Sequence, residues 1–266
     1  MNTNDQVTTI KDLIIGVHSV YHALSNPKRS LNTATLYVTA EGLSNFHSLY
    51  PTSNKIKVNQ VILSAHDFQD RAKKVYQDFD FEWSRIQSQM LLVIDSIAPT
   101  TEKLIEMTKN KSDLKIVALD QITDIQNAGA ITRSAAFYNV DAIIYGSKNS
   151  FRLTPAYFRI SSGGAEYVPL FCVASLSKWL KKFNENQINV YALTEGGQEI
   201  KNTDQFLSDA KQIRKKVLVF GEEEKGISHA CLMNSTYKLR LDNQGPITTL
   251  NVSNACAITM EKFWGI

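Results

Sequence analysis

The stretch that decides the fold lies near the C-terminus and reads PITTLNVSNA (residues 246–255). Two threonines, an asparagine and a serine fall close together, and an apolar run then continues almost to the end of the chain. Thr and Asn are favoured at the N-cap of a helix, because their side-chain oxygens accept hydrogen bonds from backbone N–H groups that have no partner inside the helix. The stretch predicts a terminal helix that follows Thr249. Taken alone, it is more simply explained as an ordinary capped helix than as a binding site.

Bulk properties point to a globular protein. The chain has 266 residues, of which 43% are hydrophobic and 21% charged, and its net charge is +3. This length suffices for one large or two modest domains, and the composition excludes disordered and fibrous classes. The mildly basic balance permits an anionic partner such as RNA without requiring one. Residues 1–12 lack the apolar core of a signal peptide and no apolar run reaches membrane-spanning length, so we expect a cytoplasmic protein with no membrane partner.

Cysteines and histidines form no metal or disulfide pattern. Cys172, Cys231 and Cys256 are odd in number and far apart in the sequence, which fits neither a disulfide framework nor a zinc site. His18 and His22 share one face of an expected helix, but the sequence offers no third ligand beside them. We therefore expect no metal cofactor, and a structural role for these histidines.

The succession of expected strands and helices divides the chain near residues 96–113. Before the division, the sequence predicts strands at 35–39, 61–64 and 90–95, helices after Gly16 and over 67–77, and a loop or variable helix over 41–59. After it, expected strands at 116–119, 142–145, 167–170, 190–193 and 217–220 alternate with expected helices at 127–138, 156–160, 176–183 and after Thr249. This alternation predicts a parallel sheet covered on both faces. We expect a small α/β domain over residues 12–95, a linker over 96–112, and a second α/β domain over 113–266.

Three segments of the second domain carry candidate chemistry, because ligands of such sheets bind outside the carboxyl ends of the strands. The first, NAGAITR (127–133), begins a helix with Asn127 as a plausible cap. The second, GEEEKGI (221–227), brackets three carboxylates and a lysine between two glycines. The third is PITTLNVSNA. Each alone has a simpler explanation as a cap, an acidic first turn of a helix or a glycine turn, and none is a phosphate-binding glycine motif.

Taken together and in this order, the three segments resemble the SPOUT superfamily, and within it the SpoU branch of RNA ribose 2′-O-methyltransferases. The intervening stretch SSGGAEYVPL (161–170) resembles the segment before the next strand of that family. The resemblance covers residues 113–265 well. It extends more weakly to GVHSVYHAL (16–24), which is similar to part of the small RNA-binding domain that precedes the catalytic domain in ribosomal-RNA members.

This resemblance implies an α/β fold in which the C-terminal segment passes through a loop and forms a deep trefoil knot, one of the rare exceptions to unknotted chains. In the family, S-adenosylmethionine lies bent in the knot. The implied cofactor contacts here are Thr194, Gly196, Gly221, Ile227, Leu241 and Leu250. Small and apolar residues suit this task, because adenine needs a flat apolar slot and glycine lets backbone groups reach its edge.

The resemblance also implies a reaction, the transfer of a methyl group to a ribose 2′-hydroxyl, with Arg133 at the position the family assigns to this step. Because arginine stays protonated, it is a poor base, and we expect it to grip the flanking phosphate and orient the hydroxyl. Asn127, Glu223, Thr249 and Asn251 match the remaining polar positions, with Glu223 as the expected carboxylate partner of Arg133. Family members are homodimers in which one subunit completes the pocket of the other.

The sequence departs from the family pattern at three positions. Ile125 stands where the family usually has Pro, so the turn loses a fixed φ. Thr249 replaces Ser, and Asn254 replaces a small apolar residue. Basic residues of the first domain are candidate phosphate contacts, with a solvated face as the equally good alternative: Lys28, Arg29, Arg71, Lys73 and Lys74.

The leading hypothesis is S-adenosylmethionine-dependent methylation of a guanosine ribose in large-subunit (23S-type) ribosomal RNA. One alternative is the same chemistry on tRNA, although tRNA members usually lack the N-terminal domain. The other alternative is a non-catalytic RNA-binding paralogue that assists ribosome assembly.

Overall fold

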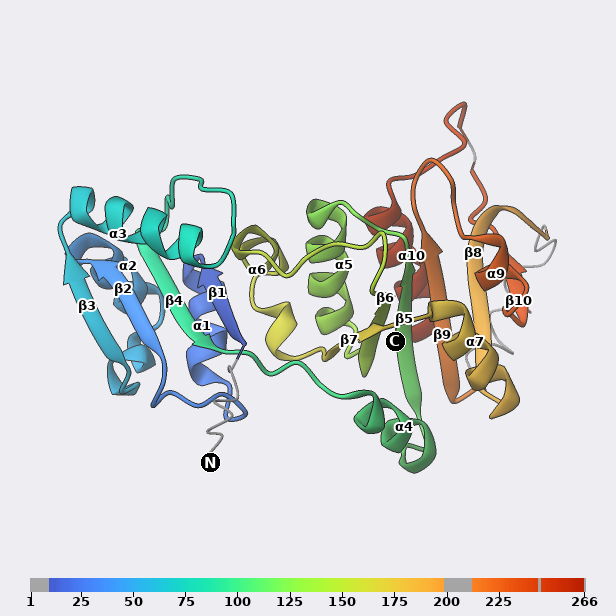
Figure 1. Ribbon diagram of the computed structural model, residues 1–266. Helices are drawn as coiled ribbons and strands as arrows, with labels where there is room; N and C mark the ends of the chain where they lie inside the picture. Colours follow the sequence, from blue (N-terminus) through green and yellow to red (C-terminus); the bar gives the residue numbers. More distant parts are fainter. Residues whose placement is uncertain (1–9, 199–211, 244, 266) are drawn as a thin grey trace, which may run out of the picture. The chain divides into compact units, whose positions relative to one another are not determined.

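A computed structural model describes residues 10–198, 212–243 and 245–265 of the chain, and it forms two compact units, each with its own sheet (Figure 1). The first unit comprises the described part of Met1–Ile97 together with Leu153–Glu166. The second comprises Ala98–Arg152 and the described part of Tyr167–Ile266. Within the described residues, no helix combines the length and the apolar character needed to cross a membrane.

The sheet of the first unit has the strand order β1-β4-β2-β3. Its elements are β1 (Lys11–Ile15), α1 (Val17–Ser25), β2 (Thr35–Thr39), α2 (Ala40–Leu49), the 3-10 helix η1 (Pro51–Lys55), β3 (Asn59–Leu63), α3 (Ala65–Asp78) and β4 (Met90–Asp95). Strand β4 runs antiparallel to β1 and β2, whereas β2 and β3 are parallel. Leu13 and Leu91 of the sheet pack with Phe68 and Ala72 of α3 in one core cluster.

Two elements of this unit differ from the expectation. The expected helix after Gly16 is present, but the residues before it form the edge strand β1, because all but its first residue are buried or nearly so in a pairing with β4. The expected loop or variable helix over 41–59 is the helix α2 followed by η1. The side-chain oxygen of Thr39 caps α2 by accepting a hydrogen bond from the backbone N–H of Gly42 at 3.0 Å.

The chain passes from one unit to the other three times, whereas the sequence predicts a single linker over 96–112. The segment 153–166 lies between strands of the second unit in the sequence but folds with the first, as α6 (Pro155–Ser161) and the 3-10 helix η2 (Gly164–Glu166). The expected linker itself contains the helix α4 (Thr101–Asn110), whose Leu104 is fully buried in the second unit.

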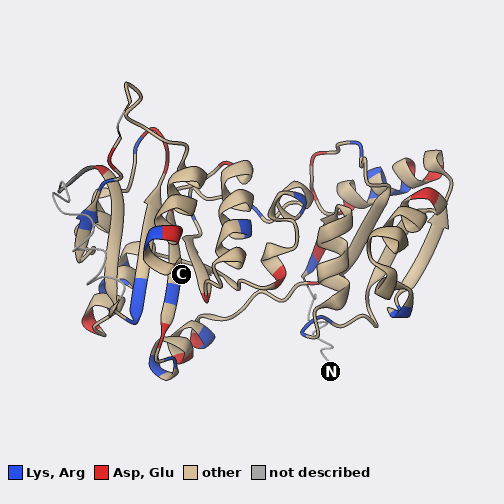
Figure 2. Ribbon diagram, turned by 180° about the vertical axis from the view of Figure 1, so that it is seen from behind, with Lys and Arg blue, Asp and Glu red and all other residues tan. Residues whose placement is uncertain are grey.

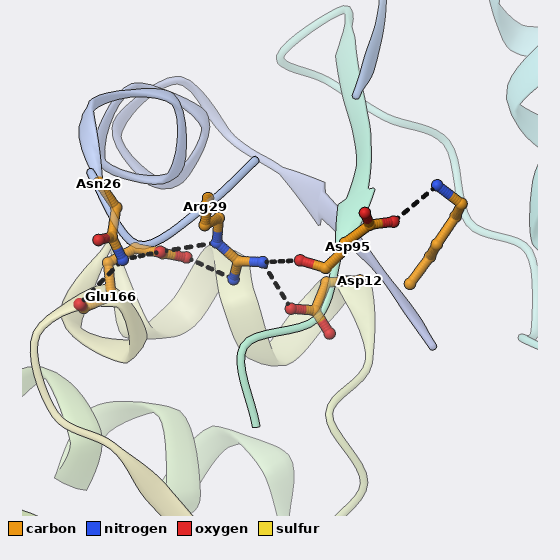
Figure 3. A network of polar contacts seen from close by, with 6 residues as sticks. Asp12, Asn26, Arg29, Asp95 and Glu166 are labelled. Atoms are coloured by element: carbon orange, nitrogen blue, oxygen red, sulfur yellow. Dashed lines mark hydrogen bonds and ion pairs between the residues drawn. The ribbon is translucent and has the colours of Figure 1, made fainter. Parts of the chain in front are cut away.

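A buried ionic network holds this segment in the first unit (Figure 3). The guanidinium of Arg29 donates hydrogen bonds to both carboxylate oxygens of Glu166, each at 2.8 Å. It also donates to Asp12 at 2.9 Å and to the backbone oxygen of Asp95 at 2.7 Å. The hydroxyl of Ser19 in α1 also donates a hydrogen bond to the backbone oxygen of Phe158 in α6 at 2.6 Å. Such a bidentate pair fixes orientation as well as distance, so the segment has one defined position in the first unit.

The second unit is the expected parallel α/β sheet, with the strand order β10-β8-β9-β5-β6-β7. Its strands are β5 (Leu114–Asp120), β6 (Ala142–Gly146), β7 (Leu170–Val173), β8 (Asn189–Gln198), β9 (Lys215–Gly221) and β10 (Tyr237–Leu239). Strand β7 begins after Pro169 and not at residue 167 as expected, since Pro has no N–H for a ladder hydrogen bond.

Helices cover both faces of this sheet, and they are α5 (Ile125–Phe137), α7 (Leu176–Glu185), α9 (His229–Leu232) and α10 (Val252–Trp264) (Figure 1). Ile116 and Ala118 of β5 share a core with residues of α4, α7 and α9. On the other face α10 packs against α5 and β9, and its Phe263 contacts Tyr191 of β8 edge to face at 5.0 Å. The sheet is therefore buried on both sides, as parallel sheets are.

Candidate functional site

The loops that follow β5 and β9 meet at the carboxyl edge of the parallel sheet. These two strands are neighbours, and their register places Asp120 opposite Gly221 at the end of the ladder. Asp120 is buried, and its carboxylate accepts a hydrogen bond from the backbone N–H of Ser228 at 2.7 Å. This bond ties the far end of the 221–227 loop to the end of β5. Both loops thus start from fixed points at the edge where ligands of such sheets bind.

One carboxylate oxygen joins all three candidate segments. The Oε1 of Glu223 accepts hydrogen bonds from Asn127 Nδ2 at 3.2 Å, from Asn251 Nδ2 at 2.6 Å and from the backbone N–H of Val252 at 3.2 Å. Asn251 Nδ2 also donates to Asn127 Oδ1 at 2.8 Å. Glu223, Asn127 and Asn251, called the Glu223 cluster below, come from the β9 loop, from α5 and from the start of α10. The structure therefore brings together three of the five predicted catalytic residues.

The start of each helix explains how these side chains are aimed. Asn251 is the N-cap of α10, and its Oδ1 accepts from the N–H of Ser253 at 2.9 Å, as the sequence predicts for a polar helix start. The cap of α5 is Asp124 and not Asn127, since Asp124 accepts from the N–H of Gln126 at 2.8 Å. Ile125 takes the first helical position, where Pro is favoured and where the family usually has it. Because Asn127 does not cap the helix, its side chain is available to hydrogen-bond with Glu223.

The acidic run after β9 forms a tight loop and not the first turn of a helix. The N–H of Gly226 donates to the carbonyl of Glu222 at 2.8 Å, and Gly226 has a φ of +67°, a conformation that favours glycine. Gly221 lies directly against this turn, because a Cβ atom at Gly221 would come within 2.3 Å of the Gly226 backbone. Both glycines are therefore required by the loop geometry.

A cavity of about 520 Å³ opens beside the Glu223 cluster. Its wall contains the predicted residues Thr194, Gly221, Glu223, Leu241, Thr249 and Leu250. Phe220, Arg240, Ile247 and Val252 also line the wall. The sequence did not name them as cofactor contacts, although Ile247 and Val252 lie in PITTLNVSNA and Arg240 follows the end of β10. Ile227 is instead buried in the core under the loop. Gly196 lies in β8, and its surroundings fall outside the described part of the chain.

The comparisons with known proteins agree with this geometry. Residues 115–261 match the SpoU rRNA Methylase family. The chain belongs to this family. It is 31% identical over 157 residues to an uncharacterized tRNA/rRNA methyltransferase of Borreliella burgdorferi, a match that covers 59% of this chain and 66% of that protein. It is 30% identical over 145 residues to the 23S rRNA (guanosine-2'-O-)-methyltransferase RlmB of Pseudomonas syringae pv. tomato, covering 54% of this chain and 56% of RlmB. These matches thus span less than two thirds of either relative.

A solved structure extends the likeness of fold to both units of this SpoU family member. The SpoU methyltransferase AviRb from Streptomyces viridochromogenes, in complex with AdoMet, matches with a TM-score of 0.71 at 18% sequence identity. The match covers 95% of this chain and 88% of AviRb. At this identity, the likeness shows a shared fold. The predicted α/β fold and the predicted family are confirmed.

The remaining predicted residue, Arg133, lies apart from the Glu223 cluster. On a helix with 3.6 residues per turn, a side chain six residues after Asn127 points about 120° away from it. Arg133 is exposed, and no ion pair with Glu223 forms among the described residues. The expected Arg133–Glu223 pair is therefore replaced by amide and backbone donors. Within its own chain, this SpoU protein presents Arg133 to solvent.

Two cysteines of the second unit, Cys231 and Cys256, are buried. Burial raises the pKa of the Cys231 thiol on α9 to about 12, and it raises the pKa of Cys256 on α10 well above its ordinary value. Both thiols therefore stay protonated at neutral pH and are poor nucleophiles. Over residues 10–198, 212–243 and 245–265, no group of three His, Cys, Asp or Glu side chains is arranged to hold a metal ion.

Proposed function

We propose that this protein is an S-adenosylmethionine-dependent RNA methyltransferase that modifies a ribose 2′-hydroxyl, that of a guanosine in large-subunit (23S-type) ribosomal RNA. The observation that carries the proposal is the Glu223 cluster, in which the three separated family segments meet at the wall of one cavity. A degenerate RNA-binding paralogue would have no need to keep this polar arrangement intact.

The cavity suits the proposed cofactor in size and in charge. Its volume lies within the usual range of small-molecule sites, about 300–1,000 Å³. Apolar side chains such as Leu241 and Leu250 offer a slot for adenine. Among the residues that the structure describes, five carboxylates and two cationic side chains line the wall. This excess of negative charge favours a ligand with a cationic centre. When bound, S-adenosylmethionine supplies a methyl group on a positively charged sulfonium with a good neutral leaving group.

The path of the chain supports the proposed trefoil knot, which stays a prediction. Strand β10 lies at the edge of the sheet, whereas α10 packs against β9 and α5 in its middle. Residues 240–251 must therefore return from the edge to the centre, and several of them line the cavity on the way.

We propose further that the protein is a homodimer in which Arg133 enters the site of the partner subunit. Arg133 is exposed and lies apart from the Glu223 cluster of its own chain, so the partner subunit is the proposed source of the arginine that grips the RNA phosphate and orients the hydroxyl. The neighbouring helices α5 and α10 each also expose a large apolar side chain, Phe137 at 81% and Ile258 at 40% accessible. Exposed apolar side chains on one face are typical of a surface that a second protein covers.

Ribosomal RNA is the proposed substrate because the chain has a folded first unit before its methyltransferase unit and because RlmB is among its relatives. The tRNA alternative keeps the same chemistry and differs only in the RNA that is bound. We place the activity in the cytoplasm.

Two experiments test these proposals. Calorimetry with S-adenosylmethionine should show saturable binding, and the absence of heat at millimolar cofactor would favour the non-catalytic paralogue. A map of ribose methylation in RNA from cells lacking the protein should lose one site in large-subunit ribosomal RNA. Loss of a tRNA site instead would establish the tRNA alternative, and an unchanged map would remove support for the enzyme.

Replacing Gly221 with Ala should weaken S-adenosylmethionine binding at least about tenfold. The added Cβ would overlap the Gly226 backbone, so the loop that lines the cavity must move. Gly245→Ala is the matched control, because a Cβ there meets nothing within 4 Å although the residue also lines the cavity. Calorimetric titration of both variants checks this prediction, and equal affinities would show that the 221–226 loop does not shape the cofactor site.

A further inference from the structure

The outer face of α1 in the first unit carries rings in place of charges. The helix buries Ser19, Val20, Ala23 and Leu24 against the core and turns His18 and Tyr21 outward, whereas His22 is only partly exposed. It contains no Asp, Glu, Lys or Arg, and its ribbon accordingly has no blue or red segment in Figure 2. The outward face of a helix in a globular protein is normally charged or strongly polar. The exposed side of α1 therefore differs from that of an ordinary surface helix in carrying aromatic and imidazole rings.

Contacts with the segment after α2 hold these rings in place. Tyr21 stacks on Tyr50 with ring centroids 3.7 Å apart and planes 7° from parallel. His18 Nδ1 lies 2.5 Å from the hydroxyl of Tyr50, and the hydroxyl of Tyr21 lies 3.5 Å from Thr52 Oγ1. His18 is exposed and both tyrosines are partly exposed. His18, Tyr21 and Tyr50, called the α1 ring surface below, thus form a preorganised platform that solvent reaches.

Two further residues are relevant to the α1 ring surface, His22 of the same helix and Lys55 of the segment that follows Tyr50. The ring of His22 contacts Tyr21 edge to face and lies so close to Gly163 that a Cβ there would come within 2.2 Å of it. Burial, reinforced by the nearby His18, lowers the pKa of His22, so its ring is neutral at pH 7. Lys55 is exposed at the end of η1, three residues after Thr52.

We propose that the α1 ring surface binds an unpaired nucleotide of the RNA substrate by stacking, an inference that rests on the proposed function for the identity of RNA. Sequence-specific RNA recognition targets unpaired bases, which stack on aromatic and histidine side chains. A base has a flat π face and an uncharged, hydrogen-bonding edge, which matches a platform of tyrosine rings flanked by an imidazole and hydroxyl groups. Lys55, exposed and three residues after Thr52, is the proposed contact for a neighbouring phosphate. The methyltransferase unit would then receive RNA that the first unit holds by its bases.

Replacing both tyrosines tests the proposal. Tyr21→Ala with Tyr50→Ala should weaken binding of a labelled large-subunit ribosomal RNA transcript at least about fivefold, the lower end expected for one stacked base. Stacking on a base releases no counterions from the RNA backbone. The slope of log Kd against log salt concentration should therefore be the same for the double Ala variant as for wild type. The KM for RNA should rise, while kcat at saturating RNA and the affinity for S-adenosylmethionine stay at wild-type values. Tyr21→Phe with Tyr50→Phe keeps the rings and should bind RNA nearly as well as wild type.

Matched controls make the outcome decisive. His66→Ala and Ile62→Ala change exposed side chains elsewhere in the same unit and should leave RNA binding unchanged. His18→Ala removes an exposed side chain, and it should give a smaller loss in the same direction as the double Ala variant. Equal RNA binding by the folded double Ala variant and wild type would overturn this inference alone. Loss of affinity for a ribosomal protein instead of RNA would also overturn it. If wild-type protein neither binds nor methylates RNA, the proposed function falls as well.

Discussion

Arg133→Ala should reduce the rate of methyl transfer to RNA at least about a hundredfold, the loss expected when a reacting group is no longer aligned. Binding of S-adenosylmethionine should stay unchanged, because Arg133 is exposed and is not part of the cavity wall. The measurement is kcat at saturating RNA together with a calorimetric Kd for the cofactor. Arg214→Ala removes another exposed arginine of the same unit and serves as the control. A variant of Arg133 that keeps the wild-type rate would refute the role proposed for this residue.

A mixture of two variants, assayed at a cofactor concentration too low to fill the weakened site of Gly221→Ala, distinguishes whether Arg133 acts in its own subunit or in the partner's. Arg133→Ala lacks the arginine, and Gly221→Ala binds the cofactor too weakly to react under these conditions. If Arg133 acts across the dimer, a mixed dimer has one complete site, and random exchange should restore about a quarter of the wild-type rate. If it acts within its own subunit, no mixed dimer has a complete site and no activity returns. A monomer in light scattering would contradict the dimer itself.

Much of the second unit could be predicted from the sequence because its signals are local. Short aliphatic runs such as 217–220 become buried parallel strands, and the polar start of the last helix indeed holds its cap, Asn251. That the three residues of the Glu223 cluster lie together could be expected once their segments were placed at the carboxyl edge of the sheet. By contrast, β1 was missed because its apolar residues run directly into the glycine before α1, without the polar break that usually separates a strand from a helix.

What could not be predicted depends on partners that are distant in the sequence. Asp124 and Asn127 are both good caps, and the choice between them is settled by Glu223, which lies 96 residues from Asn127. The placement of residues 153–166 depends on Glu166 and Arg29, which are 137 residues apart. A single sequence shows neither pair, so a boundary based on local pattern assigns the whole of 113–266 to one domain.

Arg29→Met should lower the free energy of unfolding of the first unit by about 3–5 kcal/mol, the usual cost of removing one partner from a buried ion pair. The side chains of Arg29 and Glu166 are only 1% and 3% exposed, so the carboxylates of Glu166 and Asp12 would be left buried without their cation. Urea unfolding followed by circular dichroism measures the change. Lys11→Met is the control, because its pair with Asp95 is partly exposed and should contribute no more than about 1 kcal/mol.

The pH dependence of this loss tests its electrostatic cause. Burial raises the pKa of Asp12 above its ordinary value of 3.8 even though the attraction of Arg29 opposes the shift. A carboxyl group whose pKa is raised by folding favours the folded state at low pH, and this contribution is lost as pH rises from 3.8 through the raised value. Without the attraction of Arg29, the pKa of Asp12 should rise further. The free energy of unfolding of Arg29→Met should therefore fall more than that of wild type as the pH rises above 3.8. The difference between the two proteins should therefore shrink toward pH 4. A difference that stays constant with pH would mean that Arg29 stabilises the segment 153–166 by packing and not by its charge.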